Sequence, residues 1–184
     1  MWCEDKDGVK VGPSRSYWDN GNLKGEVSYD DEGRAHGDAA SYYEDGSLEW
    51  EGEYDHGTQT GTSTFYYENG QKREEAEVED GQYHGSYRSW YENGQLRSEG
   101  QNVDGQPDGY WTYWYSNGNK KREGEYDLGS ACGPWIFYWE ATGEKQKEGD
   151  YHHGECGTWT HYTEDGQLDH TEDFEACPPD PLCT

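Results

Sequence analysis

The sequence predicts an all-β repeat protein: an elongated, twisted, single-layer antiparallel β-meander of about seven 24-residue hairpin units. Three observations support this fold class. The first is a set of glycines spaced 24 residues apart: Gly37, Gly61, Gly85, Gly109, Gly133 and Gly157. The others are the aromatic run that follows each glycine and the Asn-Gly or Asp-Gly pair that follows nearly every run. Such a period indicates units that bury their apolar faces against their neighbours.

The elements of one unit follow in order from its leading glycine, which we number position 1; the first unit begins at Gly12. Positions 3 to 7 are rich in aromatic residues, as in Tyr-Arg-Ser-Trp-Tyr at 87–91, and favour a first strand. Positions 9 and 10 hold pairs such as Asn93-Gly94. Both residues tolerate positive φ, so the pair predicts a hairpin turn. A second strand follows at positions 12 to 18 and ends in an Asp/Gly loop such as Asp104-Gly105.

The second strand alternates in character. In 48–54, carboxylates point to one face and apolar residues to the other, because the side-chain period of a strand is two. Position 15 is glutamate in five units, a row that we interpret as a solvated face and that a cation or a basic partner would also suit: Glu26, Glu51, Glu75, Glu99 and Glu123. Position 16, on the apolar side, is glycine at Gly52, Gly100 and Gly124. An aromatic ring from an adjacent strand is expected to lie across this bare backbone.

The first strand is aromatic on both faces, at positions 6 and 7. A single-layer sheet cannot bury both rows, so either twist hides one row or one row is a platform facing solvent. Position 3 adds tryptophans in the C-terminal half. Because Tyr and Trp most often anchor interfaces, the predicted binding residues are the rings at positions 6 and 3: Tyr66, Trp90, Trp114, Tyr138, Tyr162, Trp111, Trp135 and Trp159.

Composition narrows the classes of partner and chemistry. Only 29% of the 184 residues are hydrophobic, and nine Trp and seventeen Tyr replace an aliphatic core. The net charge of -26 repels nucleic acid and anionic lipid, so we expect neither as a partner. Phosphate loops, nucleophile elbows and His-Glu-x-x-His motifs are missing, so we expect no enzyme activity and no cofactor. We expect no metal site either: His152 and His153, near Glu155 and Cys156, face opposite ways on a strand.

Five cysteines in a short chain favour disulfides and an oxidising compartment. A bridge between Cys177 and Cys183 would pin the proline-rich tail as a cap. Cys132 and Cys156 share the last position of adjacent units, about 10 Å apart if two strands separate them, so a bridge there requires the loops to fold toward each other. Cys3 either pairs with the C-terminal cysteines in a closed array or attaches a lipid. No apolar run suits a signal peptide or a membrane span. We expect a secreted or cell-surface protein whose leader has been removed, in preference to a cytoplasmic one.

The pattern Tyr-Tyr-Glu-Asn-Gly-Gln-x-Arg-x-Glu, followed by Asp-Gly-Gln-x-His-Gly, runs through 66–85. It resembles the MORN-repeat variant of bacterial proteins labelled as YwqK-type antitoxins. The resemblance covers 12–175, between a lead-in at 1–11 and a Cys/Pro-rich tail at 176–184. It implies a scaffold or interaction module, and the antitoxin label implies a protein partner that is neutralised. A looser resemblance, to aromatic wall-binding repeats that hold choline or glucan, implies carbohydrate binding.

Three functions are compatible with these patterns. We favour a non-enzymatic interaction protein that presents a row of Tyr and Trp, rimmed by carboxylates, to a protein partner. The second is a structural protein that forms filaments by self-association, because an open meander leaves an unpaired strand edge at each end. The third is a carbohydrate-binding module that stacks sugars on Trp111, Trp135 and Trp159.

Overall fold

The computed structural model describes residues 3–4, 8–152 and 154–177, and these residues form fifteen strands and no helix. The strands are β1 (Cys3–Glu4), β2 (Lys10–Tyr17), β3 (Leu23–Tyr29), β4 (Ala35–Tyr42), β5 (Leu48–Asp55), β6 (Thr58–Tyr66), β7 (Lys72–Glu79), β8 (Gln82–Trp90), β9 (Leu96–Val103), β10 (Gln106–Trp114), β11 (Lys120–Asp127), β12 (Ser130–Tyr138), β13 (Lys145–His152), β14 (Glu155–Tyr162) and β15 (Leu168–Asp173).

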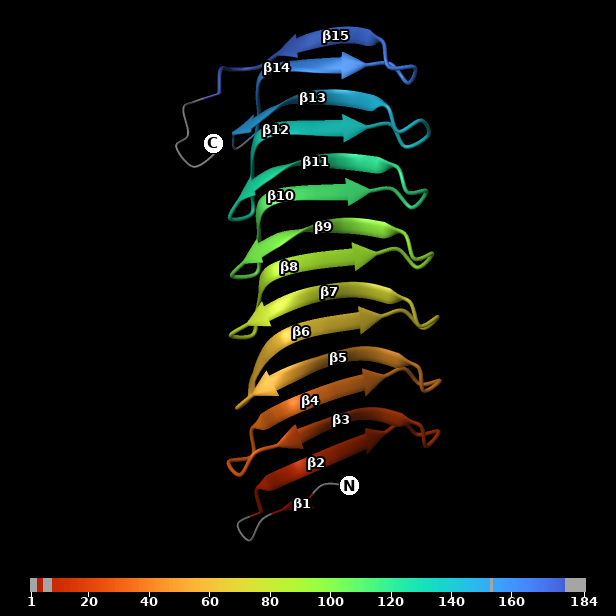
Figure 1. Ribbon diagram of the computed structural model, residues 1–184, viewed down its shortest axis with the longest axis vertical. Coiled ribbons are helices and arrows are strands. Elements are labelled where there is room, and N and C mark those ends of the chain that lie inside the picture. Colours follow the sequence, from red (N-terminus) through yellow and green to blue (C-terminus); the bar gives the residue numbers. More distant parts are fainter. Residues whose placement is uncertain (1–2, 5–7, 153, 178–184) are drawn as a thin grey trace. The chain divides into compact units, whose positions relative to one another are not determined.

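The chain divides into two compact units, each an antiparallel meander. The first unit holds the residues up to Gly85 together with 92–94, and the second holds 86–91 and the residues from Gln95 onward. Strands β2 to β7 in the first unit, and β9 to β15 in the second, pair in chain order, as Figure 1 shows. The predicted all-β meander of hairpin repeats is confirmed in each unit.

The glycine that marks the 24-residue period lies inside the first strand of each repeat rather than before it. Gly109, for example, lies within β10 at a φ of 69°. The pairing of β10 with β9 shifts register between Asp108 and Thr112, which places this glycine in a β-bulge. A bulge of this kind favours a residue that accepts positive φ, and only glycine does so without a steric cost. The 24-residue spacing of these glycines therefore marks a recurring β-bulge.

The two ends of a hairpin use different turns. At Asn69-Gly70 only Gly70 has positive φ, and its amide donates to Tyr67 O at 2.9 Å. This is a three-residue loop with a glycine bulge, so the sequence correctly predicts a hairpin here, but Asn69 does not take positive φ. At Asp104-Gly105 both residues have positive φ, of 50° and 79°, as a two-residue turn requires.

Asparagine is favoured in the first kind of turn because its side chain makes two hydrogen bonds. Asn69 Oδ1 accepts the Gln71 amide at 2.9 Å, and Asn69 Nδ2 donates to Glu92 O, in the equivalent turn one repeat further on, at 2.9 Å. Asn117 makes the same pair of bonds. This side chain therefore closes its own turn and ties it to the turn of the next repeat.

The aromatic face is built from tryptophans that lie across glycines. A Cβ on Gly100 would lie 2.3 Å from the indole of Trp111, and one on Gly124 would lie 2.3 Å from that of Trp135. The predicted packing of a ring from an adjacent strand is confirmed at these two glycines. At Gly52 the ring belongs to the same strand instead, because Trp50 would lie 2.6 Å from the added carbon.

The position-3 tryptophans are therefore buried, so they do not form a platform that faces solvent. The exposed fractions are 4% for Trp111, 2% for Trp135 and 1% for Trp159. Tyr126 and Tyr151 pack edge-on against Trp135, with ring centroids 5.1 and 5.9 Å away. The bare glycine backbone forms a recess that takes the indole, and neighbouring rings cover it.

Candidate functional site

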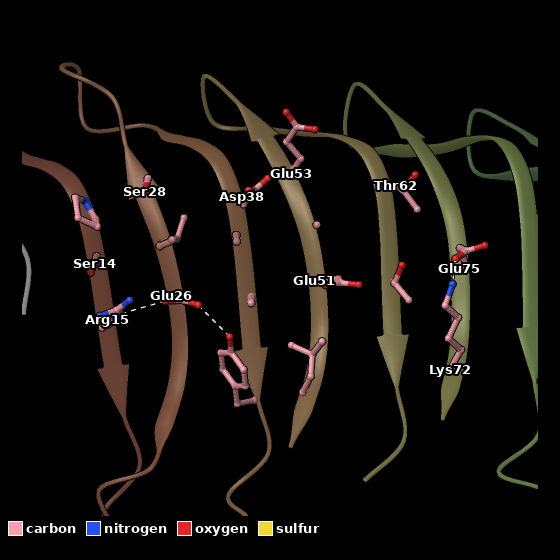
Figure 2. A pocket seen from close by; sticks show the side chains of 18 residues that line it. Ser14, Arg15, Glu26, Ser28, Asp38, Glu51, Glu53, Thr62, Lys72 and Glu75 are labelled. Carbon is pink, nitrogen blue, oxygen red and sulfur yellow. Dashed lines mark hydrogen bonds and ion pairs between the residues drawn. The ribbon is translucent and has the colours of Figure 1, made fainter. Parts of the chain in front are cut away.

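The opposite face of the sheet is acidic and carries an open groove in the first unit. The groove crosses β2 to β7 and has a volume of about 950 Å³ (Figure 2). Small side chains, including Ala40 and Thr64, form its floor, and Glu26, Glu51 and Glu75 from position 15 line it. These glutamates come from three successive repeats, so the 24-residue period sets their spacing along the groove.

Tyrosines at position 6 hold the glutamates at position 15 across neighbouring repeats. In the unit that begins at Gly133 the turn is one residue longer, so the equivalent glutamate is Glu148. The phenol donates to the Glu Oε1 of the preceding repeat in four cases: Tyr42 to Glu26 (3.0 Å), Tyr66 to Glu51 (2.6 Å), Tyr138 to Glu123 and Tyr162 to Glu148 (2.5 Å). Position 6 therefore faces the acidic side, and the glutamate row is hydrogen-bonded rather than merely solvated.

Lysines at position 12, or at the equivalent position 13 of the unit with the longer turn, complete this arrangement. Lys120 Nζ lies 2.6 Å from Glu123, whose residue is only 7% exposed, and Lys145 Nζ lies 2.7 Å from Glu148. A buried carboxylate needs such partners because an unpaired charge is costly away from water. In these repeats the lysine and the tyrosine together satisfy the glutamate.

The hydrogen bonds shift pKa values in opposite directions for the two partners. Bonds from Tyr42 and then Arg15 lower the carboxyl pKa of Glu26. Burial and the bond to Glu51 raise the pKa of Tyr66 to about 12. At neutral pH Glu26 is therefore ionised and Tyr66 is protonated, so the face holds negative charge beside phenol rings.

The predicted binding residues fall on different faces. Those at position 6 are half-buried: Tyr66, Trp90, Trp114, Tyr138 and Tyr162. The three tyrosines point their hydroxyls at glutamates, and Trp114 pairs in register with Lys120 as Tyr66 does with Lys72. The position-3 residues Trp111, Trp135 and Trp159 are on the aromatic face and are not part of this site.

The position-7 rings also join successive repeats. Five of them donate from their polar tips to the main-chain carbonyl of the position-6 residue one repeat further on: Trp18 to Tyr42 (3.0 Å), Tyr43 to Tyr66 (2.7 Å), Tyr91 to Trp114 (2.8 Å), Tyr115 to Tyr138 (3.2 Å) and Trp139 to Tyr162 (3.1 Å). Both aromatic rows thus have a structural role, which explains why the first strand is aromatic on two sides.

The disulfide in the structure joins Cys156 to Cys177, with Cα atoms 5.1 Å apart. The prediction of a Cys177–Cys183 bridge is therefore wrong for Cys177, and Cys183 lies outside the described residues. The tail returns along β14, where Phe174 N donates to Gly157 O at 2.9 Å, and this brings Cys177 beside Cys156. Cys132 is buried and is not in this bridge. Cys156, once oxidised, is also removed from the set of metal ligands considered near His152.

These contacts define a repeat protein in which successive hairpins within each unit are tied together by the same kinds of side chain. Comparison with protein families gives a match to the MORN repeat variant at residues 10–31, 59–80, 83–102 and 107–128. These four repeats match the model of that family, and each matched range lies on a hairpin of the structure. The hairpin β4–β5 between the first two matches has the same strand–turn–strand arrangement.

Two further findings bear on function. No curated protein matches the chain in a sequence search. Among the described residues, no helix has the length and apolar character needed to cross a membrane. MORN repeats arranged as a β-meander fit a scaffold or interaction role.

Proposed function

We propose that this chain is a non-enzymatic interaction module whose acidic groove binds a basic segment of a protein partner. The observation that carries the proposal is a pair of like charges placed directly across from each other. Asp38 of β4 and Glu53 of β5 are register partners, are both exposed, and line the groove (Figure 2). Like charges in this position destabilise a sheet, and a bound cationic group would relieve the repulsion.

The groove contains carboxylates that are not used in its internal ion pairs and that could contact a partner. Glu26 is paired with Arg15 at 3.0 Å, and Glu75 is paired with Lys72. Asp38 and Glu53 have no such cationic partner among the described residues of the groove. The net charge of -26 adds a long-range field that speeds the approach of basic proteins. An extended Lys- or Arg-rich segment that lies across the strands would contact carboxylates at intervals set by the repeat.

The test is binding of a fluorescent Arg-rich peptide to the full chain and to the Asp38→Asn, Glu53→Gln double variant. We expect about 10-fold weaker binding by the variant, from the loss of two partly screened charges, and weaker binding of both proteins as salt rises. The matched control removes two exposed charges outside the groove, Glu44→Gln with Glu68→Gln. Equal weakening by both double variants would mean that the peptide follows net charge alone, and the groove would lose its assigned role.

Self-association remains the second candidate, and the last strand bears on it. All six residues of β15 are exposed, and three of them are acidic. Acidic edges repel one another, so end-to-end pairing should grow with salt or at low pH and be weak at neutral pH. Light scattering across a salt series measures this directly. Rods at low salt would favour the filament over the monomeric module.

The remaining predictions differ in support. Carbohydrate stacking on Trp111, Trp135 and Trp159 is abandoned because these rings are buried. An extracellular or other oxidising location is part of our proposal, and the Cys156–Cys177 disulfide supports it. Mass spectrometry of the chain isolated under alkylating conditions tests this location, since a reduced pair would contradict it.

A further inference from the structure

Two histidines and an aspartate meet at one edge of the first unit, away from the groove. His36 is the second residue of β4, after Ala35, while Asp55 ends β5 and His56 lies in the turn that follows. The imidazole centroids of His36 and His56 lie 4.7 Å apart. Asp55 Oδ1 lies 3.3 Å from His36 Nδ1 and 2.6 Å from His56 Nδ1. The three candidate ligand atoms converge on one point in space.

The backbone, rather than chance side-chain placement, brings these residues together. His56 and Gly57 have φ of 47° and 92°, and the Gly57 amide donates to Ala35 O at 2.7 Å. The turn is therefore fixed against the residue that precedes His36. His56 N also approaches His36 Nδ1 at 3.5 Å, so the main chain of the turn faces the first imidazole directly.

The same docking occurs three repeats later in sequence and gives an internal comparison. The Gly129 amide donates to Pro107 O at 2.7 Å, and Leu128 N donates to Asp108 Oδ1 at 3.2 Å. There the two side chains are an aspartate and a leucine, which cannot chelate a metal. The repeat thus supplies a preformed pair of positions, and the first unit fills it with two imidazoles.

We propose that His36, Asp55 and His56 bind one divalent transition-metal ion, with Zn²⁺ or Cu²⁺ best suited to the ligands. Imidazole with carboxylate is a ligand set that these ions accept, whereas Mg²⁺ and Ca²⁺ prefer oxygen alone. All three ligand atoms lie within 4.8 Å of one another. Ligands at about 2.0–2.2 Å from a shared ion are at most about 4.4 Å apart, so only a small side-chain rotation is required.

Exposure allows this rotation and leaves room for water. The side chains of His36, His56 and Asp55 are 50%, 53% and 63% exposed. The metal replaces the contact between His56 Nδ1 and Asp55 Oδ1, because a metal-bound imidazole nitrogen carries no proton. Water completes the coordination on the open side. The negative field of the chain raises the local concentration of any divalent ion, so selectivity for Zn²⁺ over Mg²⁺ is what distinguishes this site from simple charge attraction.

The experiment is a titration of the full oxidised chain with ZnCl₂, followed by calorimetry and by the imidazole proton signals in NMR. We expect one tight site per chain and line shifts at His36 and His56 first. His36→Gln and His56→Gln should each weaken this site about 10-fold or more, because each removes one of three protein ligands. Both residues are exposed, so circular dichroism should show that the variants keep their strands.

The matched control is His84→Gln, which removes a histidine from the same repeat position as His36. It should leave the tight site unchanged. The proposal is overturned if His84→Gln weakens Zn²⁺ binding as much as His36→Gln does, or if Mg²⁺ at the same concentration displaces the bound Zn²⁺. A tight site that persists in the His36→Gln, His56→Gln double variant would place the metal elsewhere and also overturn it. Peptide binding by the groove is measured separately, so failure here leaves that function testable.

Discussion

Replacing Gly124 by alanine tests whether tryptophan-on-glycine packing holds the second unit together. The new Cβ would lie 2.3 to 2.6 Å from three atoms of the Trp135 indole, which is 2% exposed. Ordinary contact begins near 3.4 Å, so the ring would have to move by about 1 Å. Overpacking of a core costs about 1–3 kcal/mol, and loss of a buried tryptophan about 3–5 kcal/mol. We expect Gly124→Ala to lower the free energy of unfolding by about 3 kcal/mol.

The sign of this change is as informative as its size. Gly124 does not have positive φ, and at such positions alanine usually stabilises by about 0.4–1 kcal/mol, because it restricts the unfolded chain. Denaturant unfolding followed by circular dichroism measures the difference, and the melting temperature should fall by about 6–12 °C. Gly25→Ala is the control. Its Cβ would meet Ala40 O at 3.2 Å and no ring, so a change within about 1 kcal/mol is expected.

A double-mutant cycle with Trp135→Ala decides the cause. Once the indole is removed, Gly124→Ala has nothing to collide with, and its cost should disappear. The coupling between the two changes should then be a few kcal/mol, as for residues in direct contact, at about 0.5–3 kcal/mol. Additive effects, or a stabilised Gly124→Ala variant, would refute the view that the ring occupies the space of the missing side chain.

Three further outcomes follow from the contacts between repeats. The pKa of Tyr66 is raised to about 12, so its contribution to the free energy of unfolding is complete below the ordinary tyrosine pKa near 10 and is lost as the pH rises toward 12. Tyr66→Phe should reduce this alkaline loss of stability, measured by denaturation at pH 9 and 11.5. An unchanged loss between the two pH values would contradict the Glu51 bond. Cys177→Ser should destabilise the last hairpin by about 3 kcal/mol, and reductant should then have no further effect on its unfolding. Asn69→Ala removes the bonds to Gln71 and Glu92 and should lower the free energy of unfolding by about 1–2 kcal/mol. Asn69→Asp should lower it less, because Asp45 makes the same acceptor bond in its own turn. Equal losses of stability in the two variants would show that the acceptor bond is unimportant.

The repeat period predicted what recurs in every unit. Hairpins, their order and the ring across Gly100 all follow from residues at fixed positions, because a strand alternates sides and a missing side chain leaves a recess. The glycine at position 1 is also evident in the sequence, but its location inside a bulged strand is not. That place depends on register between two strands, which a single strand's sequence does not specify.

The same patterns do not specify how deeply a side chain is buried or where the chain runs after the last repeat. Position 3 could be assigned to a face, yet the burial of Trp135 depends on Tyr126 and Tyr151 from other strands. The Cys156–Cys177 bridge depends on how the tail returns after the last repeat, where the period ends. His36 and His56 are 20 residues apart, and only the docking of one turn on the preceding repeat brings them together. Glycine recurs at the repeat position of Gly57, and once the contact is known this glycine is the sequence signal for the docking.

The disulfide near the C-terminal strand has a consequence for how the protein unfolds and aggregates. An outermost strand has a neighbour on one side alone, so it is the first to fray, and β15 has no buried residue to resist this. The Cys156–Cys177 bond fastens the chain beyond β15 back to β14, so the strand cannot peel away while the bond is intact. Reduction releases it and uncovers the edge of β14, a longer strand with Trp159 at its centre. The redox state of one bond thus decides whether the second unit ends in the short acidic edge of β15 or in the longer edge of β14, which is a template for aggregation.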